Sequence, residues 1–325
     1  MATSKDVAKL AGVSIATVSR TFTKRNTVSE RTAQLVLDAA KKLDYTPDNI
    51  ARSLKSNKTN TIGLVISNIY NPFFFQTASV MAKELEKYNY KILLSFNKEY
   101  DETLSNNIQS LLSAKVDAIA FTPIIYDKNL SKILHSRNIN LLQLLGNKYS
   151  EFDSILFDDY RTTCNITQYL IDHGHKKIMM IAPTEDRKHG MLDTLNKNDI
   201  STYAGNYVSV LHVNNPETII EHALLKYQPT AVISVSLTVT EAFLRVVKRL
   251  KLQIPDDISV IGYDDNLLLE LCDISAVGHD IEKLGKKACN LLLNRINHSG
   301  SDNIISPQHP LLDTHFIERK SVKYI

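Results

Sequence analysis

The residues of this chain best suited to chemistry form a short run of small and polar side chains that ends in an arginine. Ser14 can cap a helix that begins at the next residue. The outer face of that helix would carry Ile15, Ala16, Thr17 and Arg20. Such a helix fits a DNA major groove, where base edges display a readable pattern of donors and acceptors. An ordinary helical hairpin is the alternative, because the pattern alone is common.

Two further helices would position this one. Thr3 can cap a preceding helix, and Asp6 completes a capping box three residues later. Helical spacing places Leu10 in the small core that this helix would share with its neighbours. Gly12 can end the helix in the left-handed conformation. A third helix, capped by Ser29, follows, so the segment is predicted to be three short helices with a tight turn between the first two.

Charge and cysteine content indicate the binding partner and the cellular compartment of this chain. The net charge is +3 over 325 residues, but residues 1–60 hold 11 Lys and Arg against 5 Asp and Glu, and the remainder holds 27 against 30. A basic head on a slightly acidic body predicts that the head meets a polyanion. The three cysteines are widely spaced, and no signal peptide or membrane-spanning run is visible. We therefore expect a cytoplasmic protein without a membrane partner.

From residue 61 onward, short apolar runs alternate with amphipathic helices. Runs such as residues 61–67, 118–123 and 177–182 are typical of buried parallel strands. Strand and helix alternation predicts a doubly wound sheet, and its repetition after residue 158 predicts two lobes. Ligands of such sheets bind outside the carboxyl ends of the strands, so the cleft between the lobes is the expected pocket.

The sequence carries no signature of catalysis or of a bound cofactor. It contains no Gly-x-Gly-x-x-Gly, Walker loop, His-Glu-x-x-His or Cys-x-x-Cys. The pairs Asp158-Asp159 and Asp264-Asp265 are adjacent, and adjacent residues at a strand end usually point apart. They do not make an acid–base pair by themselves. We therefore expect no enzyme activity, no catalytic residues, no cofactor and no metal site.

A set of short motifs runs along nearly the whole chain in one order. They are Asp6-Val-Ala-Lys-Leu-Ala-Gly-Val-Ser14, Thr17-Val-Ser-Arg20, Tyr45-Thr-Pro47, Asn49-Ile-Ala-Arg-Ser-Leu54, Thr61-Ile-Gly-Leu-Val65, Gly174-His-Lys-Lys-Ile178, Pro255-Asp-Asp-Ile-Ser-Val-Ile-Gly-Tyr-Asp-Asp265 and Glu318-Arg-Lys-Ser321. Together they resemble the lactose/galactose-repressor family of bacterial transcription regulators. The resemblance implies an α/β protein: an N-terminal all-α helix-turn-helix head plus a two-lobed, doubly wound parallel-sheet body, like that of periplasmic binding proteins.

The function that the resemblance implies is that of a homodimeric repressor. It would bind double-stranded DNA at a near-palindromic operator under the control of a small-molecule effector, most simply a sugar or sugar derivative. The alternative is a small-molecule binding module without a regulatory DNA role. The implied domains are a DNA-binding head at 1–46, a hinge helix or linker at 47–60, and an effector-binding and dimerisation body at 61–325. Lobe one would comprise about 61–157 and 281–310, and lobe two about 158–280 and 311–325.

The resemblance also assigns DNA-binding residues. They are Thr3, Ile15, Ala16, Thr17, Ser19, Arg20, Asn26, Thr27, Ala51, Leu54 and Lys55. Arg20 would contact guanine, and the hydroxyl and amide side chains of the head would contact phosphates. The family's hinge helices pair in the minor groove and wedge a leucine into the central base step, and Leu54 matches that leucine. A Leu54 that packs on the body is the alternative.

The effector-binding residues implied are Phe73, Phe74, Arg187, Ser236 and Asp264. Phe73 or Phe74 would lie against the apolar face of a sugar or purine, although packing in the core is an equal alternative. Arg187 would grip effector oxygens with its fork of donors, and Asp264 would accept from ligand hydroxyls.

Some positions depart from the family pattern. Phe96, Leu145 and the pair Ser236-Leu237 replace polar residues that are common in family pockets. The departures weaken the expectation of a free simple sugar and leave open a less hydroxylated, larger or phosphorylated effector, or a pocket that no longer responds. The run Asp172-His-Gly-His-Lys176 could suggest a metal site, but the resemblance implies a turn before a strand.

Overall fold

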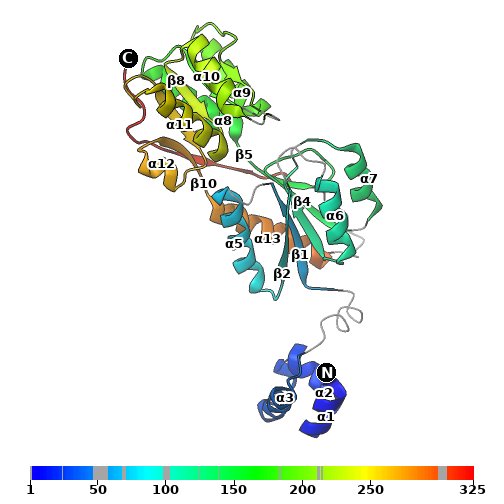
Figure 1. Cartoon of the computed structure of the whole chain (residues 1–325). Coiled ribbons are helices and arrows are strands. Elements are labelled where there is room, and N and C mark those ends of the chain that lie inside the picture. Colours follow the sequence, from blue (N-terminus) through cyan, green and yellow to red (C-terminus); the bar gives the residue numbers. More distant parts are fainter. Residues whose placement is uncertain are drawn as a thin grey trace. The chain divides into compact units, whose positions relative to one another are not determined.

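The fold divides into two compact units, Met1–Thr59 and Asn60–Ile325, in a computed structural model (Figure 1). The structure describes residues 2–23, 25–46, 58–67, 71–97, 103–123, 125–137, 139–182, 184–210, 213, 215–298 and 306–325. The expected hinge residues Ala51, Leu54 and Lys55 lie outside these ranges. None of the described helices is both long and apolar enough to cross a membrane.

The head consists of helices whose ends follow the predicted caps. They are α1 (Ser4–Ala11), α2 (Ile15–Thr23), the 3-10 turn η1 (Arg25–Thr27) and α3 (Glu30–Lys42). The Thr3 and Asp6 side chains form the predicted capping box, with the backbone N–H of Thr3 donating to Asp6 at 2.9 Å. Gly12 ends α1 with a φ of 67°. A left-handed residue at this position lets the chain turn sharply into α2.

The core of the head is small and contains mostly valine and alanine. Val7, Val18 and Val36 come from the three different helices and are each no more than 1% exposed. The prediction that Leu10 faces this core is wrong, because its side chain is 52% exposed. The reason is geometric: α1 has only eight residues, and Val7 with Ala8 already fills the narrow face that a helix this short can bury.

The first sheet of the body has the strand order β11-β5-β4-β3-β1-β2 among the described residues, and every neighbouring pair is parallel. Its strands are β1 (Thr61–Ile66), β2 (Lys91–Phe96), β3 (Ala118–Phe121), β4 (Asn140–Leu144), β5 (Asp153–Phe157) and β11 (Leu311–Leu312). Four helices cover it: α5 (Pro72–Glu86), α6 (Thr103–Ser113), α7 (Lys128–Ser136) and α13 (Ile281–His298). Helices α5 and α13 pack together, and so do α6 and α7 (Figure 1). We call this sheet and its helices lobe one.

The second sheet has the order β12-β10-β9-β8-β6-β7 in the described part of the chain, and β12 alone runs antiparallel to its neighbour. Its strands are β6 (Ile178–Ile181), β7 (Tyr207–Val208), β8 (Ala231–Ser234), β9 (Ser259–Tyr263), β10 (Ser275–His279) and β12 (Thr314–Ile317). The helices are α8 (Asp159–Asp172), α9 (Glu185–Lys197), α10 (Pro216–Tyr227), α11 (Leu237–Leu250) and α12 (Leu267–Leu271). Helix α8 packs on α9, and α10 on α11 (Figure 1). This sheet and these helices are lobe two.

The chain crosses between the lobes more than once, so each lobe is built from separate segments. After β10 in lobe two, α13 packs in lobe one, and β11 pairs there with β5 before β12 joins lobe two. Leu311–Leu312 therefore belongs to lobe one, slightly beyond the expected change near residue 310. Arg295 of α13 binds the Asp153 carboxylate at 2.6 and 2.7 Å, which ties α13 to the start of β5.

Candidate DNA-binding surface and effector pocket

The outer face of α2 presents the side chains that the sequence singled out. Ile15 is 49% exposed, and Ala16, Ser19 and Arg20 are also exposed. Val18, on the opposite face of the same helix, is only 1% exposed. The helix therefore has a buried side that fixes it in the head and a free side that offers an apolar patch and a guanidinium.

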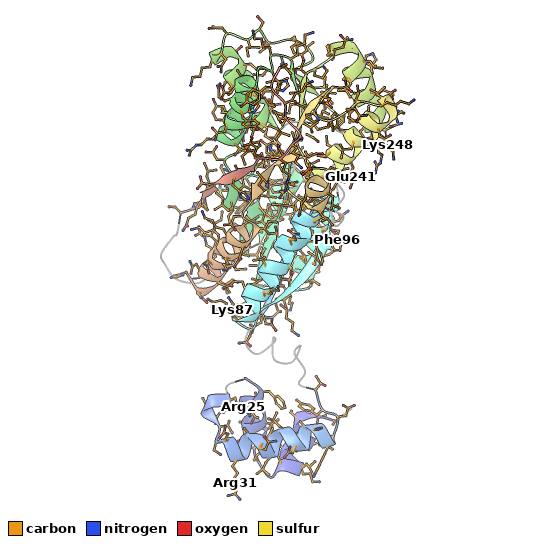
Figure 2. The ribbon with its side chains drawn as sticks, turned by 90° about the vertical axis from the view of Figure 1, so that its left-hand side faces the viewer. Arg25, Arg31, Lys87, Phe96, Glu241 and Lys248 are labelled. Atoms are coloured by element: carbon orange, nitrogen blue, oxygen red, sulfur yellow. The ribbon has the colours of Figure 1, made fainter. Side chains whose placement is uncertain are left out.

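Two of the expected phosphate contacts take part in helix caps, Thr3 as the N-cap of α1 and Thr17 as a partner of Ser14. The Thr3 hydroxyl donates to the Asp6 carboxylate at 2.7 Å, and the Thr17 hydroxyl lies 2.9 Å from that of Ser14. Thr3 and Thr27 are exposed, whereas Thr17 is partly buried. The side chain of Asn26 lies outside the described part of the structure. Basic side chains on the same unit include Arg25 and Arg31 (Figure 2).

A cavity of about 220 Å³ lies where the lobes meet. Its lining comes from the start of α5, the turn after β9, the end of β10 and the strand β12. These residues are Asn71, Pro72, Phe73, Gln76, Asp264, Asp265, Asn266, Gly278, His279, Ile281, His315 and Ile317. Phe73 and Asp264 are thus brought together from positions nearly two hundred residues apart, whereas Phe74, Arg187 and Ser236 do not line this cavity.

Asp264 presents its carboxylate from a turn with a φ of 62°, and its side chain is 17% exposed. Oδ1 lies 3.3 Å from Nδ1 of His279, and Oδ2 accepts from Nδ2 of Asn71 at 3.4 Å. Burial opposes ionisation, but His279 and the charge of Arg187 outweigh it and lower the pKa of Asp264. The carboxylate is therefore ionised and able to accept hydrogen bonds from a ligand.

A second arginine holds the turn that carries Asp264. Arg319 forms a two-pronged pair with Asp265, at 2.8 and 3.1 Å, and also donates to the carbonyl of Ile274 at 2.7 Å. Asn266 caps α12 and donates to the Asp264 carbonyl at 2.6 Å. The Glu318-Arg-Lys-Ser321 motif thus fixes the turn that carries Asp264 from the antiparallel segment beside it.

Phe73 satisfies both of the interpretations offered for it. Its side chain is 7% exposed and belongs to the core of lobe one, yet it also lines the cavity. The ring lies edge-on to those of Phe74 and His279, with centroids 5.5 Å away in each case. Phe73 is therefore the apolar wall of the cavity, and Phe74 stands behind it.

Arg187 is engaged by groups of the protein itself. Its Nε and Nη2 lie 3.0 and 3.1 Å from the two carboxylate oxygens of Asp159, and Nη1 donates to the carbonyl of Val235 at 2.8 Å. The guanidinium also lies 4.1 Å from the ring centre of Tyr263. Burial opposes the charge, but Asp159 raises the pKa of Arg187 above its ordinary value. The expected effector ligand is thus, in this structure, a buried tie between α8 and α9.

The positions that depart from the family pattern have structural roles. Ser236 caps α11, accepting from the N–H of Val239 at 3.4 Å, and Leu237 is buried beneath it. Leu145 has a φ of 61° and packs on the core of lobe one. Phe96 ends the edge strand β2 with its side chain 42% exposed, and it does not line the cavity.

Sequence reasoning missed several polar residues near the ends of the strands. His279 and His315 line the cavity, and the buried hydroxyls of Ser67 and Thr122 have no hydrogen-bond partner among the described residues. A ligand hydroxyl or amide can satisfy such a group, because leaving it unpaired costs free energy. Of these residues, Ser67 and Thr122 had a usable signal, because they lie at the ends of the predicted strands 61–67 and 118–123.

The two histidines of Asp172-His-Gly-His-Lys176 face different partners. His173 bonds the Tyr169 carbonyl at 2.7 Å, and His175 bonds the Thr230 hydroxyl at 2.9 Å. Gly174 has a φ of 92°, and a Cβ there would lie 2.3 Å from the carbonyl oxygen of Ile325. Within the described ranges, no group of three or more His, Cys, Asp or Glu side chains is placed to hold a metal ion.

We expect His175 to make the protein less stable in mild acid. Burial lowers the pKa of His175 from 6.5, despite the opposing effect of its hydrogen bond to the backbone of Lys323. The unfolded chain then binds the proton more readily, so stability present above the unfolded pKa is lost as the pH falls below it. Urea unfolding should show that the free energy of unfolding falls less between about pH 7.5 and 5.5 in His175→Gln than in the unmodified protein. Equal losses would mean that other groups cause the pH dependence.

Comparison with known proteins decides the family. The model for bacterial regulatory proteins of the lacI family matches residues 3–48, and that for a periplasmic binding protein-like domain matches residues 167–322. The HTH-type transcriptional repressor PurR of Vibrio vulnificus is 31% identical over 340 residues, covering 100% of both chains. PurR of Actinobacillus pleuropneumoniae is 30% identical over 314 residues, covering 91% of each. The chain belongs to the lacI family.

Solved structures of transcription regulators share the fold. The lac repressor dimer bound to operator and the anti-inducer ONPF has a TM-score of 0.83 at 22% identity, with 99% of both chains covered. The complex of the transcriptional regulator CelR with cellobiose has a TM-score of 0.71 at 24% identity, covering 99% of this chain and 100% of that one. The predicted head and two-lobed parallel body are therefore confirmed.

Membership of the lacI family also fixes the general function. The protein is a DNA-binding transcriptional repressor with an effector-binding body, and it is not an enzyme. The alternative of a binding module without a DNA role is thereby set aside.

Proposed function

We propose that two copies of this repressor bind a near-palindromic operator in the cytoplasm, with α2 of each head in a major groove. The observation that carries this proposal is the division of α2 into a face buried through Val18 and a free face with Ile15, Ala16 and Arg20. Ile15 and Ala16 can touch thymine methyl groups, and Arg20 can bind guanine through two hydrogen bonds. Thr3, Thr17, Ser19, Asn26 and Thr27 contact phosphates, which position the head without reading sequence.

Selection from a pool of random duplexes tests this assignment and identifies the operator in the same experiment. A homodimer whose heads are related by a twofold axis should enrich two inverted half-sites at a fixed spacing. Enrichment of a single half-site would contradict the dimeric arrangement. Failure to enrich any sequence at near-physiological salt would contradict operator-specific binding.

We propose that Leu54 of each hinge is wedged into the central base step, flanked by Ala51 and Lys55 in the minor groove. Leu54→Ala should then lower affinity for the selected operator while most non-specific binding remains, because the kinked DNA loses its apolar support. Anisotropy titrations on the operator and on a scrambled duplex would measure both affinities. Equal losses on the two duplexes would contradict the wedge.

We propose a dimer in which apolar side chains of lobe one are covered by the second copy. Phe75 on α5 is 56% exposed, and Phe96 at the end of the edge strand β2, labelled in Figure 2, is 42% exposed. Leu93, 41% exposed, lies on the opposite face of the same edge strand. Exposed apolar side chains that gather on neighbouring elements are typical of interaction surfaces. An open edge strand with such side chains also needs a cover.

Phe96→Asp should therefore shift the protein toward monomer, because it places a charge in that surface. Sedimentation equilibrium measures the change, and Leu225→Asp is a matched control, because Leu225 is 60% exposed on α10 in the other lobe. Loss of the dimer should also lower the affinity for the operator, because two heads are needed to fill the full site. A Phe96→Asp protein that stays as dimeric as the control would contradict this surface.

We propose that the effector is a neutral sugar or sugar derivative bound between the lobes. Asp264 places a carboxylate at the cavity, Asp265 is already paired with Arg319, and no lysine or arginine is among the described lining residues. Phe73 offers an apolar wall for the C–H face of a ring, and Asp264 can accept from hydroxyls. This charge balance disfavours a phosphorylated effector as long as Arg187 stays paired with Asp159.

A further inference from the structure

His279 lies where the chain leaves lobe two, at the end of β10 and two residues before α13 of lobe one. Its side chain is 3% exposed. The ring packs on aromatic rings of lobe one, with centroids 4.4 Å from that of Phe157 and 5.5 Å from that of Phe73. On its other side, Nδ1 faces Asp264 of lobe two at 3.3 Å. One imidazole therefore contacts both lobes and the carboxylate of the cavity.

Asn71 reaches the same carboxylate from lobe one. It is the N-cap of α5, and its Oδ1 accepts from the N–H of Phe73 at 3.0 Å. Its Nδ2 donates to Oδ2 of Asp264 at 3.4 Å. The two oxygens of Asp264 are thus shared between a residue at the crossing of the lobes and a residue of the opposite lobe.

Both contacts with Asp264 are loose. Ordinary N–H···O hydrogen bonds span about 2.7–3.2 Å, and both distances exceed that range. The buried Nδ1 of His279 also has no partner in hydrogen-bond geometry within the described structure. In contrast, Asp265 beside it is held firmly by Arg319, at 2.8 Å for the shorter contact. The loose pair can be exchanged for better partners while the turn itself stays in place.

We propose that Asn71, His279 and Asp264 form a latch that holds the lobes together in the unliganded repressor, and that an effector releases it by taking over the Asp264 carboxylate. The proposal rests on the proposed role of Asp264 in effector binding. A ligand shifts a conformational equilibrium only through different affinities for its states. Competition for one carboxylate supplies that difference where a ligand hydroxyl takes the position beside Oδ1 or Oδ2 that His279 or Asn71 now occupies.

The latch acts on one pair of helices. Asn71 caps α5, and His279 leads into α13 through Asp280, whose carboxylate accepts from the N–H of Lys283 at 2.8 Å. The two helices are in close contact, since a Cβ at Gly285 of α13 would lie 2.6 Å from a methyl carbon of Val80 on α5. Release of the latch would therefore free the first turns of two helices that pack tightly together in lobe one.

The test measures the distance between the lobes in the full-length protein by paired spin labels. Labels are attached at Tyr88→Cys in lobe one and Leu225→Cys in lobe two, both exposed positions, after Cys164 and Cys272 are replaced by serine. The labelled chain is mixed with an excess of unlabelled chain so that each dimer carries one labelled copy. His279→Phe keeps an aromatic ring at this position and removes the nitrogen that faces Asp264. Asn71→Ser keeps a capping side chain that is too short to reach Asp264.

Loss of either latch residue should broaden the distance distribution and add a second separation. His315→Phe serves as the control, because His315 lines the same cavity but lies on β12 against Gly278 of its own lobe. Its distribution should superimpose on that of the parent. Superimposed distributions for Asn71→Ser, His279→Phe and the parent would overturn the latch. Operator binding, measured on the same samples, separates this result from the proposed function, because failure to prefer the selected operator contradicts the repressor assignment and not the latch.

Discussion

Arg187→Met is expected to lower the free energy of unfolding by about 3 kcal/mol, because it breaks a largely buried ion pair and leaves one partner uncompensated. The Arg187 and Asp159 side chains are only 14% and 23% exposed, and the carbonyl of Val235 would lose its donor as well. Urea unfolding at neutral pH measures the loss.

Arg245→Met is a suitable comparison for this experiment. Arg245 lies on α11 with its side chain 62% exposed, and its partners Glu217 and Glu241 are 3.4 and 3.5 Å away at the surface. Surface pairs of this kind contribute at most about 1 kcal/mol. An Arg187→Met protein no less stable than Arg245→Met would mean that Arg187 is not a structural tie. Its function as an effector ligand would then become the better interpretation.

The second large effect is expected in DNA discrimination. Arg20→Ala should relax the preference at one base pair of each half-site by roughly 1–3 kcal/mol, the usual difference for a two-pronged contact to guanine. Competition anisotropy with operators changed at single positions, all at one salt concentration, measures the preference.

Arg31→Ala provides the control for charge. Arg31 is exposed near the start of α3 in the same head, so its loss removes the same charge without touching α2 (Figure 2). This substitution should lower the affinity for all duplexes alike and make that affinity less dependent on salt concentration. If Arg20→Ala also lowers the affinity for every DNA sequence equally, Arg20 contacts phosphate and does not read a base.

Local patterns were enough to predict most of the regular structure. Strands β1, β3 and β6 lie within the predicted runs 61–67, 118–123 and 177–182, and Thr3, Ser14 and Ser29 cap helices as predicted. Strand β10 was missed, because Ser275-Ala-Val-Gly-His279 is short and carries mostly small side chains. Its strand conformation comes from pairing with β9 and β12, which are contributed by other parts of the chain.

The cavity was only partly predictable, for the same reason. Asp264 and Phe73 stand in recognisable motifs, but the sequence does not reveal that His279 contacts both lobes. That contact depends on the path of the chain between the lobes, which brings β10 against Phe73 and Phe157. Likewise, Arg187 resembles an effector ligand by motif, and only the fold brings Asp159, on α8, within 3.0 Å of it.

The most direct test of the repressor assignment is fluorescence anisotropy on a labelled palindrome with a central CG step, alongside a scrambled duplex, at fixed near-physiological salt. If the outer bases of that palindrome prove wrong, the site enriched from the random pool replaces it. Neutral and phosphorylated sugars, nucleosides and purines are added in turn. We predict preference for the palindrome, shifted by a neutral compound and not by its phosphorylated form. No preference for either the palindrome or the enriched site would contradict operator-specific repression by this protein.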